Sequence, residues 1–223
     1  MFPSVTSRKR PITRSELANI SQLHSSSSSF DDSLFLAILL TGFHGLMCLG
    51  ELTWPDVNCL RGYHKVISRG SLQIFPKSFQ FVLPGHKANR FFQGNLVLIQ
   101  STEQGNDPYA PFLSYLKLRN RRFPLRAELW LREDGTIPTR GWFLHLLHRY
   151  FPGNVGGQCL RAGGATALAE AGVPPHIIQA IGQWSSEAFQ IYICRHPALL
   201  ALLFRRHTAL RLPSPFPGFT SSS

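Results

Sequence analysis

The residues best suited to chemistry lie in the last third of this 223-residue chain. Arg161 follows the run Gly-Gly-Gln-Cys-Leu at the expected start of a helix. A guanidinium there can hold a phosphate together with the backbone N–H groups of the helix N-terminus. Tyr192 comes later, and a tyrosine hydroxyl can act as a nucleophile. Because an isolated tyrosine is more often an amphipathic core residue, the pair predicts phosphate binding and leaves nucleophilic attack open.

The charge of the chain favours a polyanionic partner. Its 23 Lys and Arg residues against 12 Asp and Glu residues give a formal net charge of +11, and 18 of the basic residues are Arg. Guanidinium groups make forked contacts with phosphates, and basic side chains on a polyphosphate release condensed counterions. We therefore expect a nucleic acid as partner and no small-molecule substrate.

The cysteines point to free thiols in a reducing compartment. They are widely spaced, and no two form a Cys-x-x-Cys pair: Cys48, Cys59, Cys159 and Cys194. A metal site built from His44, Cys48, Cys59 and His64 is the alternative, but its spacing lacks the close pair typical of zinc sites. We expect neither a metal nor a cofactor.

The positioning elements begin with a basic, serine-bearing lead over residues 1–29. One amphipathic helix is expected after Thr13, whose hydroxyl and Glu16 have the spacing of a capping box. A serine linker follows, and Asp31 or Asp32 is expected to cap an apolar helix starting at Leu34. The uncharged stretch 33–50 reaches the lower limit for a membrane span, but its glycines favour a core helix followed by a second short helix.

The middle of the chain predicts a small antiparallel sheet. The extended run YHKVISRG and the segments LQIF, FQFVL and LVLI are rich in β-branched and aromatic residues. Lys87 and Arg90 fall between the last two, on or beside a hairpin. From Pro108 onward helical patterns resume, and a Pro/Ser tail is expected to be disordered over residues 213–223. The predicted fold class is mainly α with one small β-sheet.

The order of four blocks resembles the catalytic domain of tyrosine recombinases, the phage integrase family. The blocks are TGFHGLMCLGELTWPDV, LPGHKANRFFQGN, GQCLRAGGATALAEAG and IGQWSSEAFQIYI. The series is particularly similar to integrase-like sequences of fungal mobile elements and runs from about Phe30 to Phe204. It implies an integrase-like DNA breaking-rejoining core over residues 30–212, with duplex DNA as partner and no metal or cofactor. It further implies a 3′-phosphotyrosyl intermediate.

The resemblance also assigns site residues. Tyr192 matches the nucleophile, Arg161 the second arginine, and Lys87 the lysine that protonates the leaving hydroxyl. Three positions depart from the family: Cys48 replaces the first arginine, Gln158 replaces the histidine of the His-x-x-Arg block, and Gln183 replaces the His or Trp after Gly182. Since a clamp arginine acts mainly in the transition state, we expect strand exchange to be impaired. Further DNA contacts are expected from Arg90, Arg119, Arg121 and Arg122.

Three functions remain open at this point. The first is DNA breakage and rejoining, in a homo-oligomer on DNA, with Tyr192 acting in cis or in trans. The second is a basic DNA-binding remnant of a mobile element without turnover. The third is a small protein anchored in a membrane by residues 33–50. Two further expectations are an intracellular location, nuclear in a eukaryotic host, and a role for His44 as a substitute phosphate ligand or as a plain core histidine.

Overall fold

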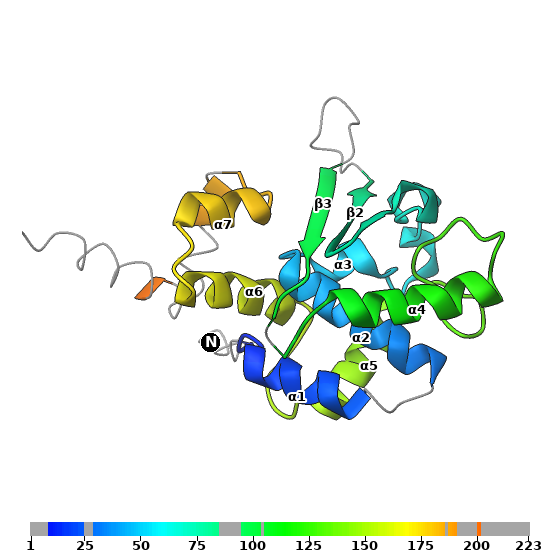
Figure 1. Cartoon of the computed structure of the whole chain (residues 1–223), viewed down its shortest axis with the longest axis horizontal. Helices are drawn as coiled ribbons and strands as arrows, with labels where there is room; N and C mark the ends of the chain where they lie inside the picture. The colour runs from blue at the N-terminus through cyan, green and yellow to red at the C-terminus, as the bar shows by residue number, and fades with distance from the viewer. Residues whose placement is uncertain are drawn as a thin grey trace, which may run out of the picture. The chain divides into compact units, whose positions relative to one another are not determined.

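The computed structural model describes residues 9–24, 29–84, 95–103, 105–185, 187–190 and 200–201. The chain divides into two compact units, residues 1–167 and residues 168–223. Figure 1 labels most of the helices and strands of the described residues. The helices are α1 Arg14–His24, α2 Phe30–His44, α3 Leu49–Leu52, α4 Tyr109–Arg122, α5 Arg140–Tyr150, α6 Gln158–Glu170 and α7 Pro175–Ile181. The strands are β1 Gln73–Phe75, β2 Ser78–Leu83 and β3 Asn95–Gln100. The predicted fold class, mainly α with a small antiparallel sheet, is confirmed.

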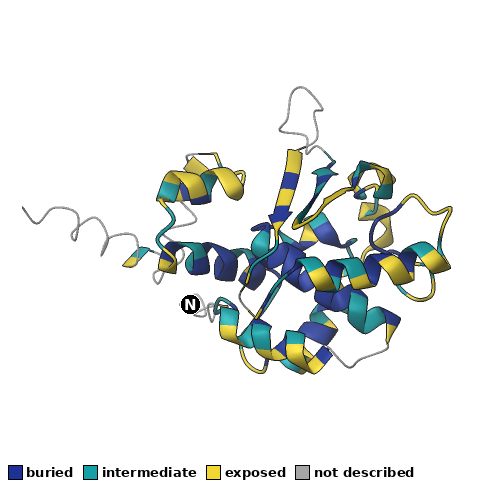
Figure 2. Ribbon diagram, in the orientation of Figure 1, coloured by how far each residue is buried: buried dark blue, intermediate teal, exposed yellow. Residues whose placement is uncertain are grey.

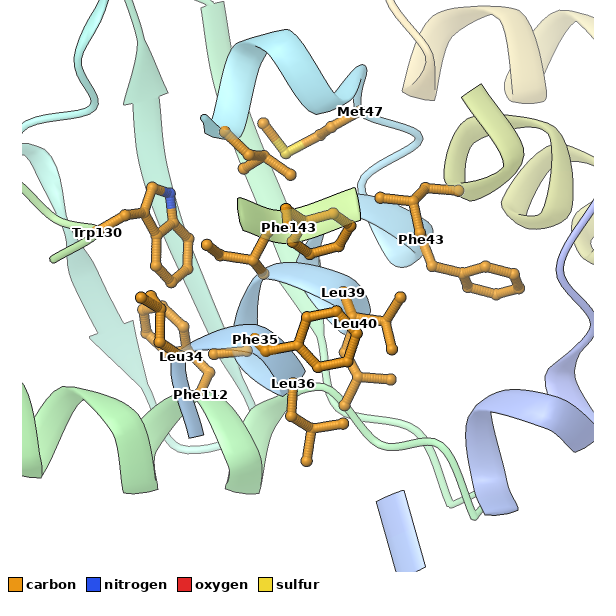
Figure 3. Close-up of a cluster of buried hydrophobic side chains, with 14 of the residues drawn as sticks. Leu34, Phe35, Leu36, Leu39, Leu40, Phe43, Met47, Phe112, Trp130 and Phe143 are labelled. Atoms are coloured by element: carbon orange, nitrogen blue, oxygen red, sulfur yellow. The ribbon is translucent and has the colours of Figure 1, made fainter. Parts of the chain in front are cut away.

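Helix α2 forms the centre of the first unit. Its residues from Leu34 to Phe43 are buried on every side, which is the pattern of a core helix and not of an amphipathic surface helix. Its ribbon is coloured as buried along most of its length (Figure 2). Its side chains meet aromatic residues from α4, from α5 and from the segment around Trp130 (Figure 3). The rings of Phe35 and Phe143 lie 5.0 Å apart between centroids. The expected core helix followed by a short helix is therefore present as α2 and α3.

The sheet has the order β1-β2-β3, with both pairs antiparallel. In the register of β2 with β3, Phe79 faces Ile99 and Phe81 faces Val97, and all four residues are buried. The Phe79 ring stacks on Phe112 of α4 at 3.8 Å between centroids, which joins the sheet to the helical core. The predicted pairing of FQFVL with LVLI is thereby confirmed.

The N-terminal segment belongs to the same core. The Thr13 backbone N–H donates to Glu16 Oε2 at 3.0 Å, and the Glu16 N–H donates to Thr13 Oγ1 at 3.3 Å, so the predicted capping box is confirmed. Ile12 and Leu17 are fully buried in the core that α2 centres. The helix α1 and the residues just before it are thus packed against the core of the first unit.

Two local predictions were wrong. Helix α2 begins at Phe30, and its cap is Ser29, whose hydroxyl accepts the Asp32 N–H; Asp31 instead accepts the Glu133 N–H at 2.8 Å. The run YHKVISRG forms two short 3₁₀ turns, Tyr63–Lys65 and Arg69–Ser71, in place of extended strand. Separately, no helix within the described ranges is long and apolar enough to cross a membrane.

Candidate active site

The start of α6 is pressed against α3 and the end of α2. A Cβ atom on Gly164 would collide with the carbonyl oxygen of Phe43, and one on Gly157 would lie 2.8 Å from Leu49 Cδ2. Only glycine allows helices to approach this closely. The sequence GGQCLRAGG therefore fixes the distance between the first turns of α6 and the loop that joins α2 to α3.

This approach brings Arg161 and Cys48 together. The Arg161 Nη1 group donates to Cys48 Sγ at 2.9 Å, although 113 positions separate the two residues. Cys48 precedes α3, and its backbone N–H donates to Glu51 Oε2 at 2.7 Å. Cys48 and Arg161, which the resemblance matches to the first and second arginine positions, are therefore in direct contact. The position where the resemblance expects a first arginine therefore holds a thiol in contact with the second.

The thiol of Cys48 is neutral. Burial raises its pKa, and this effect outweighs the opposing influence of the Arg161 guanidinium. A protonated thiol is a weak hydrogen-bond acceptor and carries no charge. Cys48 therefore neither supplies a cation to a bound phosphate nor neutralises the positive charge of Arg161.

His44 does not replace the missing cation. Its Nε2 atom lies 3.0 Å from the Asn106 carbonyl oxygen, so Nε2 carries the proton and donates. Burial is the main cause that lowers the pKa of His44 to about 4, with a weaker contribution from Arg14. At neutral pH this imidazole is uncharged and committed to a structural hydrogen bond. Of the two readings of His44, the core histidine is the one that fits the structure.

The remaining site positions are distributed as follows. Gln158 is the first residue of α6, exposed and one turn before Arg161. Gln183 lies in the second unit, just after α7, with a positive φ of 51°. Lys87, Arg90 and Tyr192 lie outside the described residues, so their roles stay predictions.

The α4 arginines differ in what they can offer to DNA. Arg119 is 1% exposed, and its guanidinium donates to the backbone carbonyls of Phe123, Arg126 and Glu128. Its expected DNA contact is therefore corrected to a structural role, since no face of the guanidinium is presented to a ligand. Arg121 is exposed, and Arg122 is exposed with an ion pair to Glu133 at 3.4 Å.

The described residues contain a cavity with basic and aromatic walls and no cluster of metal ligands. Among the described residues, no group of three or more His, Cys, Asp or Glu side chains could hold a metal ion. The sequence did not predict the cavity beside Trp54, which is lined by aromatic rings and guanidinium groups. The signal that could have indicated this cavity is the alternation of aromatic and basic residues in the run WPDVNCLRGYHK, for which only loop and strand were predicted.

Comparison with known proteins gives matches in structure only. The sequence matches no family model and no curated protein. The XerA recombinase superposes with a TM-score of 0.60 and 15% identity, over 96% of this chain and 67% of that one. The integrase of transposon Tn1549, in complex with circular intermediate DNA, gives a TM-score of 0.55 and 16% identity over 93% and 67%.

A third neighbour is the XerH site-specific recombinase bound to its palindromic difH substrate. It gives a TM-score of 0.54 and 13% identity over 86% of this chain. The chain spans about half the length of XerH, 51%. At these identities the likeness concerns the fold. The chain therefore has the integrase-like fold found in site-specific recombinases and integrases, as the resemblance of its four sequence blocks predicts.

Proposed function

We propose that this protein binds duplex DNA through its integrase-like domain and that its capacity for strand cleavage is impaired. One observation carries the proposal: the neutral thiol of Cys48 lies 2.9 Å from the guanidinium of Arg161, where a second cation is expected. The net charge of +11 and the DNA-bound state of the XerH and Tn1549 proteins support the DNA partner.

The proposed chemistry is a transesterification at a backbone phosphate. The hydroxyl oxygen of Tyr192 attacks phosphorus and its proton passes to solvent, the bond from phosphorus to the 5′-oxygen breaks, and Lys87 protonates the leaving oxygen. Arg161 holds one non-bridging oxygen as its charge develops, and no second guanidinium holds the other. Loss of one such donor lowers a rate by about 10²–10³. A homo-oligomer would be needed for exchange between two DNA sites.

The alternative is a DNA-binding protein with no turnover, the remnant of a mobile element. Cys48 favours it, because a neutral thiol cannot contribute to phosphate neutralisation. Gln158 favours it as well, since an amide cannot exchange a proton near neutral pH as histidine does. An origin in a fungal mobile element and a nuclear location are part of the proposal and rest on the sequence resemblance.

The test is capture of the covalent intermediate. Duplexes selected by the protein from a random pool are rebuilt as nicked suicide substrates, and denaturing gels detect a protein–DNA adduct. We expect little or no adduct from the natural chain and a gain of at least about tenfold when Cys48→Arg and Gln158→His are combined. Tyr192→Phe in that background should abolish the adduct.

The matched control places the same charge elsewhere. Cys59→Arg, at an exposed cysteine, combined with Gln158→His should give no gain. If the natural chain forms the adduct readily, the proposal that strand cleavage is impaired is overturned. Tight, selective binding with no adduct from either chain would leave DNA binding without turnover as the function.

A further inference from the structure

A cavity of about 470 Å³ lies in the first unit, and its lining includes none of the residues of the candidate active site. Its walls come from three segments of the chain and are listed here: Trp54, Arg61, Tyr63, Arg126, Asp134, Gly135, Thr136, Ile137 and Thr139. This volume falls within the range of sites that bind small molecules. The lining combines two guanidinium groups with two aromatic rings.

The walls of this cavity are fixed by backbone hydrogen bonds. The Trp54 N–H donates to the Pro138 carbonyl at 2.9 Å, and the Arg140 N–H donates to the Trp54 carbonyl at 2.7 Å. On the other side, the Arg69 N–H donates to the Ala127 carbonyl at 2.7 Å. The segments around Trp54 and Thr139 are therefore held to each other, and the segment around Arg126 is held to Arg69, before any ligand arrives. Such preorganisation lowers the entropy lost on binding.

The aromatic residues are oriented for stacking. The Trp54 and Tyr63 rings meet edge to face at 5.2 Å and 81°. The Arg61 guanidinium lies over the Trp54 ring at 5.6 Å and covers one of its faces. Tyr63 is 70% exposed, so its ring is the surface most open to a planar ligand.

The guanidinium groups retain donors for an anion. Arg61 Nε donates to the Pro55 carbonyl and its Nη2 to the Asp56 carbonyl, which holds the side chain in place. Arg126 makes a two-point contact with Glu128 through Nε and Nη2. Within the described ranges, the Nη1 groups of both arginines make no hydrogen bond to the protein. Each can therefore donate to a ligand.

The charge of the lining selects the ligand class. Asp134 is the one acidic lining residue, and its carboxylate is occupied by Arg132 and Thr136. A cationic ligand is disfavoured by the two guanidinium groups, and an acidic peptide would leave the aromatic rings unused. A planar ring joined to an anionic group uses both features. We propose that this cavity binds a single nucleotide unit, with its base on Tyr63 and its phosphate at Arg61 and Arg126.

The unit can be a free nucleotide or an unpaired nucleotide at the end of a DNA strand. This inference does not rest on the proposed function, because a mononucleotide reports on the cavity even in a protein that binds no duplex. The probe is deoxyadenosine 5′-monophosphate, titrated by calorimetry against the full chain. Deoxyadenosine and inorganic phosphate are titrated separately.

We expect saturable binding of the nucleotide, tighter than that of phosphate or deoxyadenosine alone. Tyr63→Ala should weaken it about fivefold or more, the scale of one base–aromatic stack, and Tyr63→Phe should retain it. Arg61→Gln or Arg126→Gln should weaken nucleotide binding and leave deoxyadenosine binding unchanged. Arg149→Gln, which removes an exposed arginine on α5, is the matched control and should have no effect.

Two duplexes separate the sources of the nucleotide. If Tyr63→Ala weakens binding of a duplex with an unpaired end but not of a blunt duplex, the unit belongs to DNA; if it affects neither, the ligand is the free nucleotide. The proposal is overturned if the nucleotide shows no saturable binding and Tyr63→Ala changes neither duplex. It is also overturned if phosphate binds as tightly as the nucleotide, or if Arg149→Gln costs as much as the cavity variants.

Discussion

Cys48 and Cys59 provide an internal comparison between a half-buried thiol and an exposed one. Because burial raises the pKa of Cys48, its thiolate is scarce at neutral pH, and the thiolate is the reactive form. We expect iodoacetamide at about pH 7.5 to modify Cys48 at least about tenfold more slowly than Cys59. Mass spectrometry of proteolytic peptides over a time course measures both rates.

The same experiment in urea is the control, since the two rates should converge once the chain unfolds. A Cys48 that reacts as fast as Cys59 in the folded protein would mean that Arg161 stabilises a thiolate there. In that case Cys48 would carry a negative charge beside Arg161, and its description as a neutral thiol would be wrong.

His44 makes a second prediction at the residue scale, on the pH dependence of stability. Its pKa is lowered from 6.5 to about 4 in the folded state, so between these values the unfolded chain binds a proton that the folded chain does not. Stability is therefore fully present above pH 6.5 and falls as the pH drops towards 4. The contribution is on the order of 3 kcal/mol at most.

His44→Gln keeps an amide donor for the Asn106 carbonyl and removes the titration. Urea unfolding at several pH values should show a shallower loss of stability for the variant over this window. Arg14 and Asp107 also act on His44, in opposite directions, and both contribute less than burial. Equal loss in the natural chain and in the variant would show that other groups account for the pH dependence.

At the scale of elements, the packing of α6 against the end of α2 decides whether Arg161 reaches Cys48. A methyl group on Gly164 would meet the Phe43 carbonyl, which is backbone and cannot rotate away. We expect Gly164→Ala to lower the free energy of unfolding by about 2 kcal/mol or more. Gly50→Ala in α3 is the matched control, because nothing lies within 4 Å of its added carbon.

Chemical denaturation measures both variants, and the control should be neutral or slightly more stable, as alanine favours helix over glycine by up to about 1 kcal/mol. The same experiment probes the site. If α6 moves away in Gly164→Ala, the thiol of Cys48 should become more reactive than in the natural chain. A Gly164→Ala variant with unchanged stability would show that the two helices are not held as closely as described.

The sequence predicted most elements because their signals are local. Thr13 and Glu16 show a capping box within four residues, and α2 is apolar on every face. It failed at Ser29, since Ser29, Asp31 and Asp32 lie within four residues and are all favourable caps, and the contact of Asp31 with Glu133 is not visible in the sequence. The pairing of Arg161 with Cys48 was predicted through the family resemblance. The burial of Arg119 was not predicted, because the basic sequence at the end of α4 does not show that its guanidinium donates to carbonyls beyond the helix.

At the scale of the whole molecule, the parts expected for strand cleavage are divided between two compact units. Cys48, Gln158 and Arg161 lie in residues 1–167, whereas Gln183 and Tyr192 belong to residues 168–223. Binding to duplex DNA is therefore the first property of the proposed function to establish.

Binding to DNA should be governed by the net charge of +11. Each phosphate contact contributes roughly 0.9 to the slope of log affinity against log salt, because contacts release condensed counterions. Even about four contacts would lower duplex affinity more than about a hundredfold between about 50 and 200 mM salt. Fluorescence anisotropy with a labelled duplex measures this slope. Salt-independent binding, or none at low salt, would count against both DNA-binding readings.

Substitutions of single arginines distinguish specific phosphate contacts from attraction by the summed charge of the protein. Arg121 is exposed on α4 and is expected to contact a phosphate, so Arg121→Gln should reduce the slope by roughly 0.9. Arg149→Gln removes the same charge from α5 and should leave the slope unchanged. If both variants reduce the slope equally, the charges act through the summed potential of the protein, and α4 has no special place on the duplex. If only Arg149→Gln does so, the DNA lies against α5, and the placement of the duplex along α4 is wrong.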